Sequence, residues 1–118
     1  ASTTDYNGVY QGHYLDFDAK ETKNKGSFPL KNFHQHQIDH MRACTGQGGI
    51  CFAIIKFVSR QETYLYPAED LFHFWDDQAN GGRKSIPYTE IAASGIKLTA
   101  QLQLPVPYLN AVDQLLKR

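Results

Sequence analysis

Two aspartates and a lysine near the start of the sequence have the spacing of a catalytic group. Asp16, Asp18 and Lys20 alternate with apolar residues in "YLDFDAK". Alternate residues of a β-strand project from the same face, so these three charged side chains should lie together. The pattern predicts a charged face on an otherwise apolar strand.

A metal ion is one way to make such a face stable. If Gln11-Gly12 forms a two-residue hairpin turn, Asp5 lies directly opposite Asp18, with their Cβ atoms about 5 Å apart. Two carboxylates this close repel each other and favour a cation between them. Hard oxygen ligands suit Mg²⁺, and Lys20 would orient or activate a water on the same face.

Two alternatives compete with this interpretation. Alternating polar and apolar residues are typical of any half-exposed hairpin, whose polar face is simply solvated. Asn7-Gly8 is also a stronger turn signal than Gln11-Gly12, and it would pair Asp5 with Tyr10 instead.

Composition narrows the class of protein. The 118 residues are 42% hydrophobic, and 12 basic residues balance 12 acidic ones, so no overall positive field attracts nucleic acid. No apolar run is long enough to span a bilayer and no signal peptide is recognisable, which predicts a cytoplasmic protein without a membrane partner. The two cysteines, Cys44 and Cys51, form no CxxC pair and are expected to be reduced thiols.

The remaining sequence predicts helices and strands in alternation. A helix is expected over 27–44, with Ser27 as a possible N-cap, Pro29 in its first turn and an end near Gly46. Buried strands are expected over 49–58 and 62–66, helices over 68–77 and 107–117, and a basic loop over 78–85. The order ββαββα predicts an α/β fold with a mixed sheet flanked by helices.

Asp5, followed after twelve residues by "DAK", is similar to the PD-(D/E)xK nuclease pattern. Longer stretches are more specific. "TTDYNGVYQGHYLDFDAKETKNKGSFPLKNFHQHQIDHM", then "GICFAII", "LFHFWD" and "GRKSIPYTEI", resemble the RecU family of bacterial Holliday junction resolvases. The resemblance covers nearly the whole chain. It implies a restriction-endonuclease-like fold and a homodimeric, Mg²⁺-dependent endonuclease, with Mn²⁺ as an alternative ion, that cuts four-way DNA junctions in recombination and repair.

The resemblance also assigns site residues. Thr3, Asp5, Asp18 and Gln37 would bind the metal, with Asp5, Asp18 and Lys20 as the catalytic residues and Lys20 stabilising the transition state. Asp18 stands where most members are expected to have Glu. Residues 1–118 would be a single nuclease domain that lacks the family's N-terminal segment, and recombinase and branch-migration proteins would be further partners.

Two sets of basic residues are candidates for DNA contact. Lys23, Lys25 and Lys31 form a local run, and Arg83 and Lys84 lie in "NGGRKS"; with the family resemblance, phosphate contact is favoured over a solvated loop. His34, His36 and His40 do not form an HExxH motif, so a zinc site is not predicted. A non-catalytic branched-DNA-binding protein and a nuclease of ordinary duplex stay open as alternatives.

Overall fold

A mixed five-stranded sheet forms the centre of the protein. The computed structural model describes residues 6–98 and 106–118, of which 106–110 are described by their backbone only. Strands β2 and β4 are parallel and the other neighbouring pairs are antiparallel. The order across the sheet is β1 (Tyr6–Tyr10), β2 (His13–Thr22), β4 (Ile50–Phe57), β5 (Glu62–Pro67) and β7 (Ile96–Leu98). The predicted mixed sheet flanked by helices is confirmed, and it is consistent with a restriction-endonuclease-like fold.

The hairpin of β1 and β2 turns at Gln11-Gly12, as predicted. Tyr6 pairs with Phe17 and Tyr10 with His13, and both turn residues have positive φ, 49° for Gln11 and 79° for Gly12. Positive φ at both central positions is the requirement of a type I′ turn, which matches the twist of the strands. The alternative turn at Asn7-Gly8 is wrong, because both residues lie inside strand β1 and pair with residues of β2.

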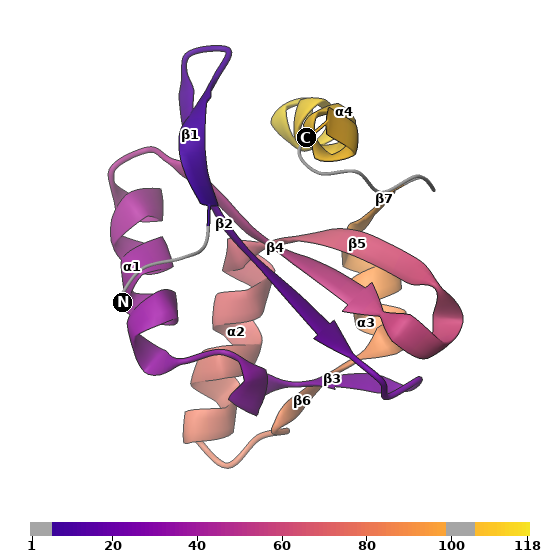
Figure 1. Ribbon diagram of the computed structural model, residues 1–118. Helices are drawn as coiled ribbons and strands as arrows, with labels where there is room; N and C mark the ends of the chain where they lie inside the picture. Colours follow the sequence, from indigo (N-terminus) through magenta and orange to yellow (C-terminus); the bar gives the residue numbers. More distant parts are fainter. Residues whose placement is uncertain (1–5, 99–105) are drawn as a thin grey trace.

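Helices cover both faces of the sheet and create two hydrophobic cores (Figure 1). One face packs against α1 (Gln35–Gly46), α2 (Ala68–Ala79) and α3 (Tyr88–Ser94), which contribute Ile38, Leu71 and Ile91 to its core. The other face packs against α4 (Val106–Leu116), which contributes Ala111 and Val112. Strand β2 therefore has one side toward α1 and the other toward α4.

The helix predicted over 27–44 begins later than expected. Its first part is β3 (Ser27–Pro29), which pairs with β6 (Ser85–Pro87), followed by a 3₁₀ turn, η1 (Leu30–Asn32). Phe28 and Leu30 are fully buried, so burial by a distant segment outweighs the local helix signal. The helix starts after His34, where a capping box with Gln37 satisfies backbone N–H groups of its first turn.

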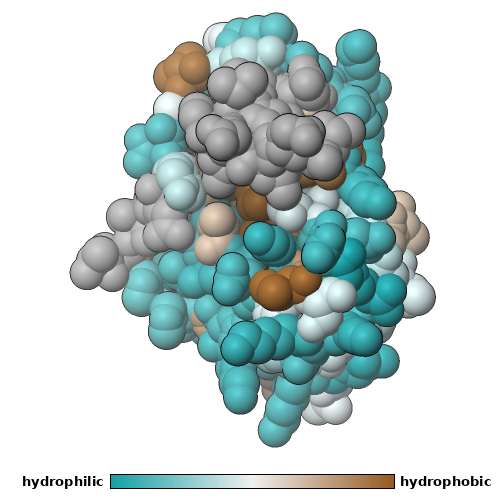
Figure 2. Space-filling model, turned by 45° about the vertical axis from the view of Figure 1, so that its right-hand side comes forward, coloured by the Kyte–Doolittle hydropathy of each residue, from teal (hydrophilic) through white to brown (hydrophobic). Residues whose placement is uncertain are grey.

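The elements that the sequence analysis missed are short. They are β3, β6, β7 and α3, and the predicted loop over 78–85 reaches into β6 at Ser85. Three-residue strands carry almost no periodic signal of their own. In the described residues, no helix has the length and apolar character to cross a bilayer. The face shown in Figure 2 is largely hydrophilic, with apolar residues in small separate patches.

Candidate active site

Asp18 is the centre of a compact group of three polar side chains. Its carboxylate is fully buried, and its Oδ2 atom lies 3.0 Å from the Lys20 Nζ atom. The Gln37 side-chain amide donates a hydrogen bond to the same oxygen at 3.1 Å. The structure thus brings together three of the residues that the resemblance assigns to the site, two from β2 and one from α1.

The strand register explains why these side chains face α1. Asp16, Asp18 and Lys20 pair in parallel with Cys51, Ala53 and Ile55 of β4, which belong to the core beneath α1, α2 and α3. Their neighbours Leu15 and Phe17 belong to the core on the α4 side. The solvated-face alternative is wrong, because Asp16 and Asp18 both have an exposed fraction of 0%.

Gln37 connects the start of helix α1 to the site. Its Oε1 atom accepts a hydrogen bond of 3.0 Å from the His34 backbone N–H, as one half of the capping box. Its amide nitrogen is thereby aimed at Asp18. Helix capping and the orientation of the Asp18 carboxylate depend on one side chain that is only 6% exposed.

Lys20 is held at the boundary between the core and solvent. Its side chain is 19% exposed, and its Nζ atom lies 5.6 Å from the centre of the Phe33 ring. An ammonium group is attracted both by the face of an aromatic ring and by a neighbouring carboxylate. A positive charge therefore lies at the accessible edge of the Asp18 group.

Thr3 and Asp5 lie outside the described residues, so their places at the site stay predictions. The pairing of Asp5 with Asp18 would extend the observed hairpin register by one residue.

The predicted DNA-binding residues lie on segments that the short sheet joins. Pairing of β3 with β6, extended by a hydrogen bond of 3.0 Å from Leu30 N–H to the Lys84 carbonyl, places Lys31 next to the loop of Arg83 and Lys84. Their side chains are exposed, as are those of Lys23 and Lys25. Lys31 and the loop of Arg83 and Lys84, far apart in the sequence, thus lie side by side.

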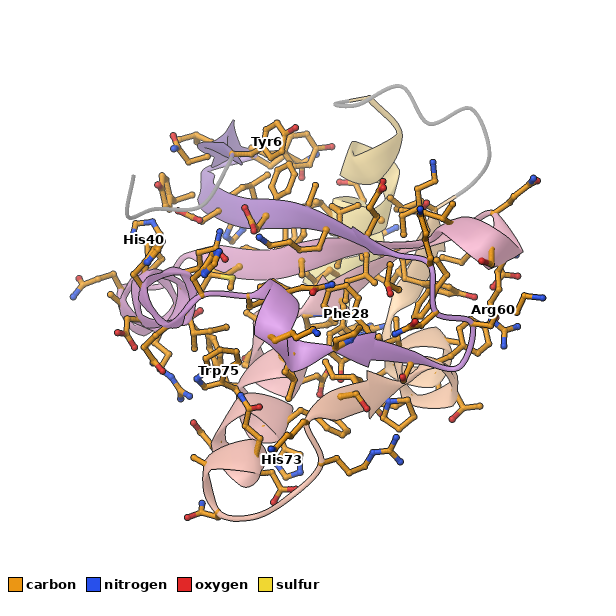
Figure 3. The ribbon with its side chains drawn as sticks, turned by 60° about the horizontal axis from the view of Figure 1, so that its bottom comes forward. Tyr6, Phe28, His40, Arg60, His73 and Trp75 are labelled. Atoms are coloured by element: carbon orange, nitrogen blue, oxygen red, sulfur yellow. The ribbon has the colours of Figure 1, made fainter. Side chains whose placement is uncertain are left out.

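Arg60 is a basic residue of this region that the sequence analysis missed. It ends the 3₁₀ turn η2 (Val58–Arg60), and its Nε–H donates to the Lys25 carbonyl at 2.7 Å. Its guanidinium lies 3.6 Å from the centre of the Tyr88 ring. Figure 3 shows Arg60 at the end of the molecule opposite His40. No local motif identifies Arg60 as part of this region, because its contacts, the Lys25 carbonyl and the Tyr88 ring, are distant in the sequence.

Asp16 has different neighbours from Asp18. Its carboxylate contacts His40 and Cys44 of α1, and these three residues offer an oxygen, a nitrogen and a sulfur atom close together. The face of β2 toward α1 therefore carries residues suited to hold a metal cofactor.

His34 and His36 lie at the exposed start of the helix. Their rings stack on each other, with 5.6 Å between the ring centres.

Comparison with known proteins agrees with the sequence patterns. A family model described as "Recombination protein U" matches residues 1–114. The chain belongs to the RecU family. Curated RecU relatives include proteins named Holliday junction resolvase RecU from Levilactobacillus brevis, 80% identical over 116 residues, and from Latilactobacillus sakei, 64% identical over 118 residues.

The alignments with these RecU proteins cover 98% and 100% of this chain, but 58% and 56% of the relatives. A third relative of the same name, from Limosilactobacillus reuteri, is 64% identical over 115 residues, which are 98% of the chain and 56% of that protein. The chain therefore spans little more than half the length of the curated relatives it matches.

Proposed function

We propose that this RecU-family protein is a crossover junction endodeoxyribonuclease, which resolves four-way DNA junctions by hydrolysing phosphodiester bonds. The observation that carries the proposal is the buried Asp18 carboxylate, contacted by Lys20 and Gln37. These residues have the spacing and the family context of a PD-(D/E)xK nuclease. The relatives' name, Holliday junction resolvase, supports a branched DNA substrate.

The ligands that we assign around Asp18 are of the kind that suits Mg²⁺, with Mn²⁺ as an alternative. Asp18 would hold the ion together with Asp5, Thr3 and Gln37, a set of carboxylate, hydroxyl and amide oxygens that hard cations prefer. The Gln37 amide nitrogen faces Asp18 while its oxygen caps the helix at His34, so the side chain would have to reorient to become a ligand. A bound divalent ion supplies Lewis-acid chemistry at a phosphate and makes a nearby water easier to deprotonate.

Lys20 supplies positive charge where negative charge grows in the reaction. Hydrolysis places additional charge on the phosphate oxygens in the transition state, and a fixed cation beside them lowers the barrier. The contact with Asp18 and the Phe33 ring fix the ammonium group at the edge of the site. A lysine held in place loses little conformational entropy when the substrate arrives.

Exposed basic residues would bind the DNA backbone. We assign phosphate contact to Lys23, Lys25, Lys31, Arg83 and Lys84, all of which are exposed. The pairing of β3 with β6 joins the segments that carry them. Binding of this type is independent of DNA sequence and weakens as the salt concentration rises.

The proposed substrate implies a symmetric enzyme. Productive resolution cuts two strands of like polarity at points related by an approximate two-fold axis, so two active sites are needed. We propose a homodimer in which residues 1–118 form one nuclease domain per subunit, acting in the cytoplasm with recombinase and branch-migration proteins. A closed two-fold dimer is also the commonest oligomeric state.

A cleavage assay tests the activity. Labelled four-way junction and linear duplex of matched sequence are incubated with the purified protein, with and without Mg²⁺. We expect paired cuts in the junction and none in the duplex, only with Mg²⁺. Junction binding without cleavage would indicate a non-catalytic branched-DNA-binding protein, and equal cutting of both substrates would indicate a general duplex endonuclease.

Light scattering at micromolar concentration tests the assembly separately. The monomer mass is 13.4 kDa, and we expect a particle of twice that mass. A monomer under all conditions, including bound junction DNA, would contradict the homodimer.

A further inference from the structure

A second group of potential metal ligands lies beside the Asp18 group. The Asp16 Oδ2 atom accepts a hydrogen bond from His40 Nε2 at 2.8 Å, and the Cys44 thiol donates to the same oxygen at 3.6 Å. Cys44 Sγ is also 3.6 Å from His40 Nε2. The three atoms therefore form a small triangle.

This triangle has nearly the dimensions of a tetrahedral zinc site. With Zn–S bonds of about 2.3 Å and Zn–N or Zn–O bonds of about 2.0 Å, tetrahedral angles place sulfur about 3.5 Å from the other ligands and nitrogen about 3.3 Å from oxygen. Both sulfur distances, 3.6 Å, already match. Only the pair Asp16–His40, at 2.8 Å, must open by about half an ångström when its hydrogen bond is replaced.

The surroundings also suit a three-ligand site with an open fourth position. Asp16 is fully buried, whereas the His40 side chain is 29% exposed. His40 and Cys44 line a surface hollow with Tyr14, Ala43, Gln47 and Gly49, and Figure 3 shows His40 where helix α1 faces the strands. The Tyr14 hydroxyl donates to Asp16 at 3.2 Å, an outer hydrogen bond of the kind that orients a carboxylate ligand.

We propose that Asp16, His40 and Cys44 form a binding site for one Zn²⁺ ion, with a water from the surface hollow as its fourth ligand. The site would join strand β2 to helix α1. It is distinct from the Asp18 group, whose oxygen ligands suit Mg²⁺, because a thiolate and an imidazole favour Zn²⁺ over harder ions. The sequence analysis predicted no zinc site because the histidines form no HExxH motif and the cysteines no CxxC pair, and it did not bring Asp16 next to the helix.

Binding involves a simple exchange of protons. In the absence of metal the Cys44 thiol donates its proton in a hydrogen bond to the Asp16 carboxylate. Zn²⁺ replaces that proton, which is released to solvent. His40 binds through Nε2 in the tautomer that carries the ring proton on Nδ1, so the Nε2 proton that Asp16 accepts in the absence of metal is exchanged through solvent to Nδ1. No oxidant or reductant is required.

The test uses Zn²⁺ and Co²⁺ as probes of the purified protein. Competition with a chromophoric chelator should show one Zn²⁺ per chain that excess Mg²⁺ does not displace. Co²⁺ in the same site should give a thiolate-to-metal charge-transfer band and the visible absorption of a tetrahedral complex. Cys44→Ser and His40→Ala should each remove the band and weaken Zn²⁺ binding by more than about 100-fold, beyond the range for outer-shell residues.

The matched control is His36→Ala, which removes an exposed histidine of the same helix and should leave Zn²⁺ binding unchanged. Circular dichroism spectra establish that each variant is folded, and Asp16→Asn gives a third, independent loss of binding. Zn²⁺ that binds Cys44→Ser and His40→Ala as well as the wild type, or a Co²⁺ complex without the charge-transfer band, would overturn the proposal.

The proposal does not depend on the nuclease function, and one variant separates the two. Asp18→Asn should lose junction cleavage and still bind Zn²⁺ with wild-type affinity. If the wild-type protein cleaved junctions but bound no Zn²⁺, the zinc site would be refuted and the nuclease function would stand.

Discussion

Asp16 and Asp18 lie two positions apart on the same strand face, and both side chains are fully buried, yet their neighbours differ. Asp18 contacts a lysine ammonium and an amide, whereas Asp16 contacts an imidazole, a thiol and a phenol. The contacts on α1 explain the difference, because Gln37 reaches Asp18 while His40 and Cys44, further along the helix, reach Asp16. The position on the strand buries both aspartates, whereas the opposing helix determines which side chains contact each of them.

Loss of the Lys20 ammonium or of the Asp18 carboxylate should have the largest effects. Lys20→Ala should reduce junction cleavage by about 10³-fold, the upper range for removal of one group that stabilises transition-state charge. Asp18→Asn should be at least as severe. Junction affinity in a gel shift should hardly change, since both residues act on the reacting phosphate.

The control for this prediction is Lys117→Ala. Lys117 is exposed and directly follows helix α4, which covers the face of the sheet opposite the site. This variant should cleave at the wild-type rate. If Lys20→Ala lost junction binding as strongly as cleavage, Lys20 would be a DNA contact and the comparison of the two aspartates would need revision.

Gln37→Ala should show two moderate effects, because Gln37 both caps the helix and orients Asp18. We expect a loss of about 1 kcal/mol in the free energy of unfolding, typical of a lost cap, and a decrease in cleavage of about 10- to 100-fold. Urea titration and junction cleavage measure the two effects.

Gln35→Ala is the matched control, since Gln35 is exposed and its side-chain amide donates a hydrogen bond to Asp39 on its own helix. It should change both quantities by much less. A Gln37→Ala protein with lower stability but full activity would limit Gln37 to helix capping.

The exposed lysines should affect affinity more gently than Lys20 affects catalysis. Lys23→Gln and Lys25→Gln should each reduce the slope of log affinity against log salt concentration by about 0.9, the value for one lost phosphate contact. Fluorescence anisotropy with labelled junction DNA measures the slope, with Lys117→Gln as control. An affinity independent of salt would show that this basic region does not contact DNA.

Glu62 provides a structural carboxylate for contrast and the smallest expected effect. The Tyr88 hydroxyl, helped by Tyr64 and Lys97, holds the pKa of Glu62 below its ordinary value of 4.5. A carboxylate whose pKa is lower in the folded than in the unfolded protein stabilises the fold at pH values above its unfolded pKa. This contribution disappears as the pH falls through the folded pKa. Glu62→Gln should therefore melt slightly lower than the wild type near neutral pH, with the difference vanishing in acid.

Melting temperatures across this pH range measure the effect, and Glu21→Gln, at an exposed position of β2, is the control. A difference between wild type and Glu62→Gln that persists below the folded pKa would assign the effect to packing instead of charge.

The parts of the fold that could be predicted are those with local causes. The Gln11-Gly12 turn and the alternation in "YLDFDAK" correctly predicted the hairpin register and the shared face of Asp16, Asp18 and Lys20. The start of helix α1 was predicted wrongly, because Ser27 and Pro29 resemble a helix N-terminus. In the structure they pair with β6, a segment more than fifty positions later.

The sequence by itself determined which residues alternate on β2, where the hairpin turns and to which family the chain belongs, since each depends on neighbours within a few positions or on ordered motifs. Only the tertiary structure decided that the charged face is buried, that Gln37 contacts Asp18, that His40 and Cys44 meet at Asp16, and that Lys31 lies near Lys84. These contacts join residues 19 or more positions apart. They depend on how helix α1 packs across the sheet and on how β3 pairs with β6, and no local pattern encodes either.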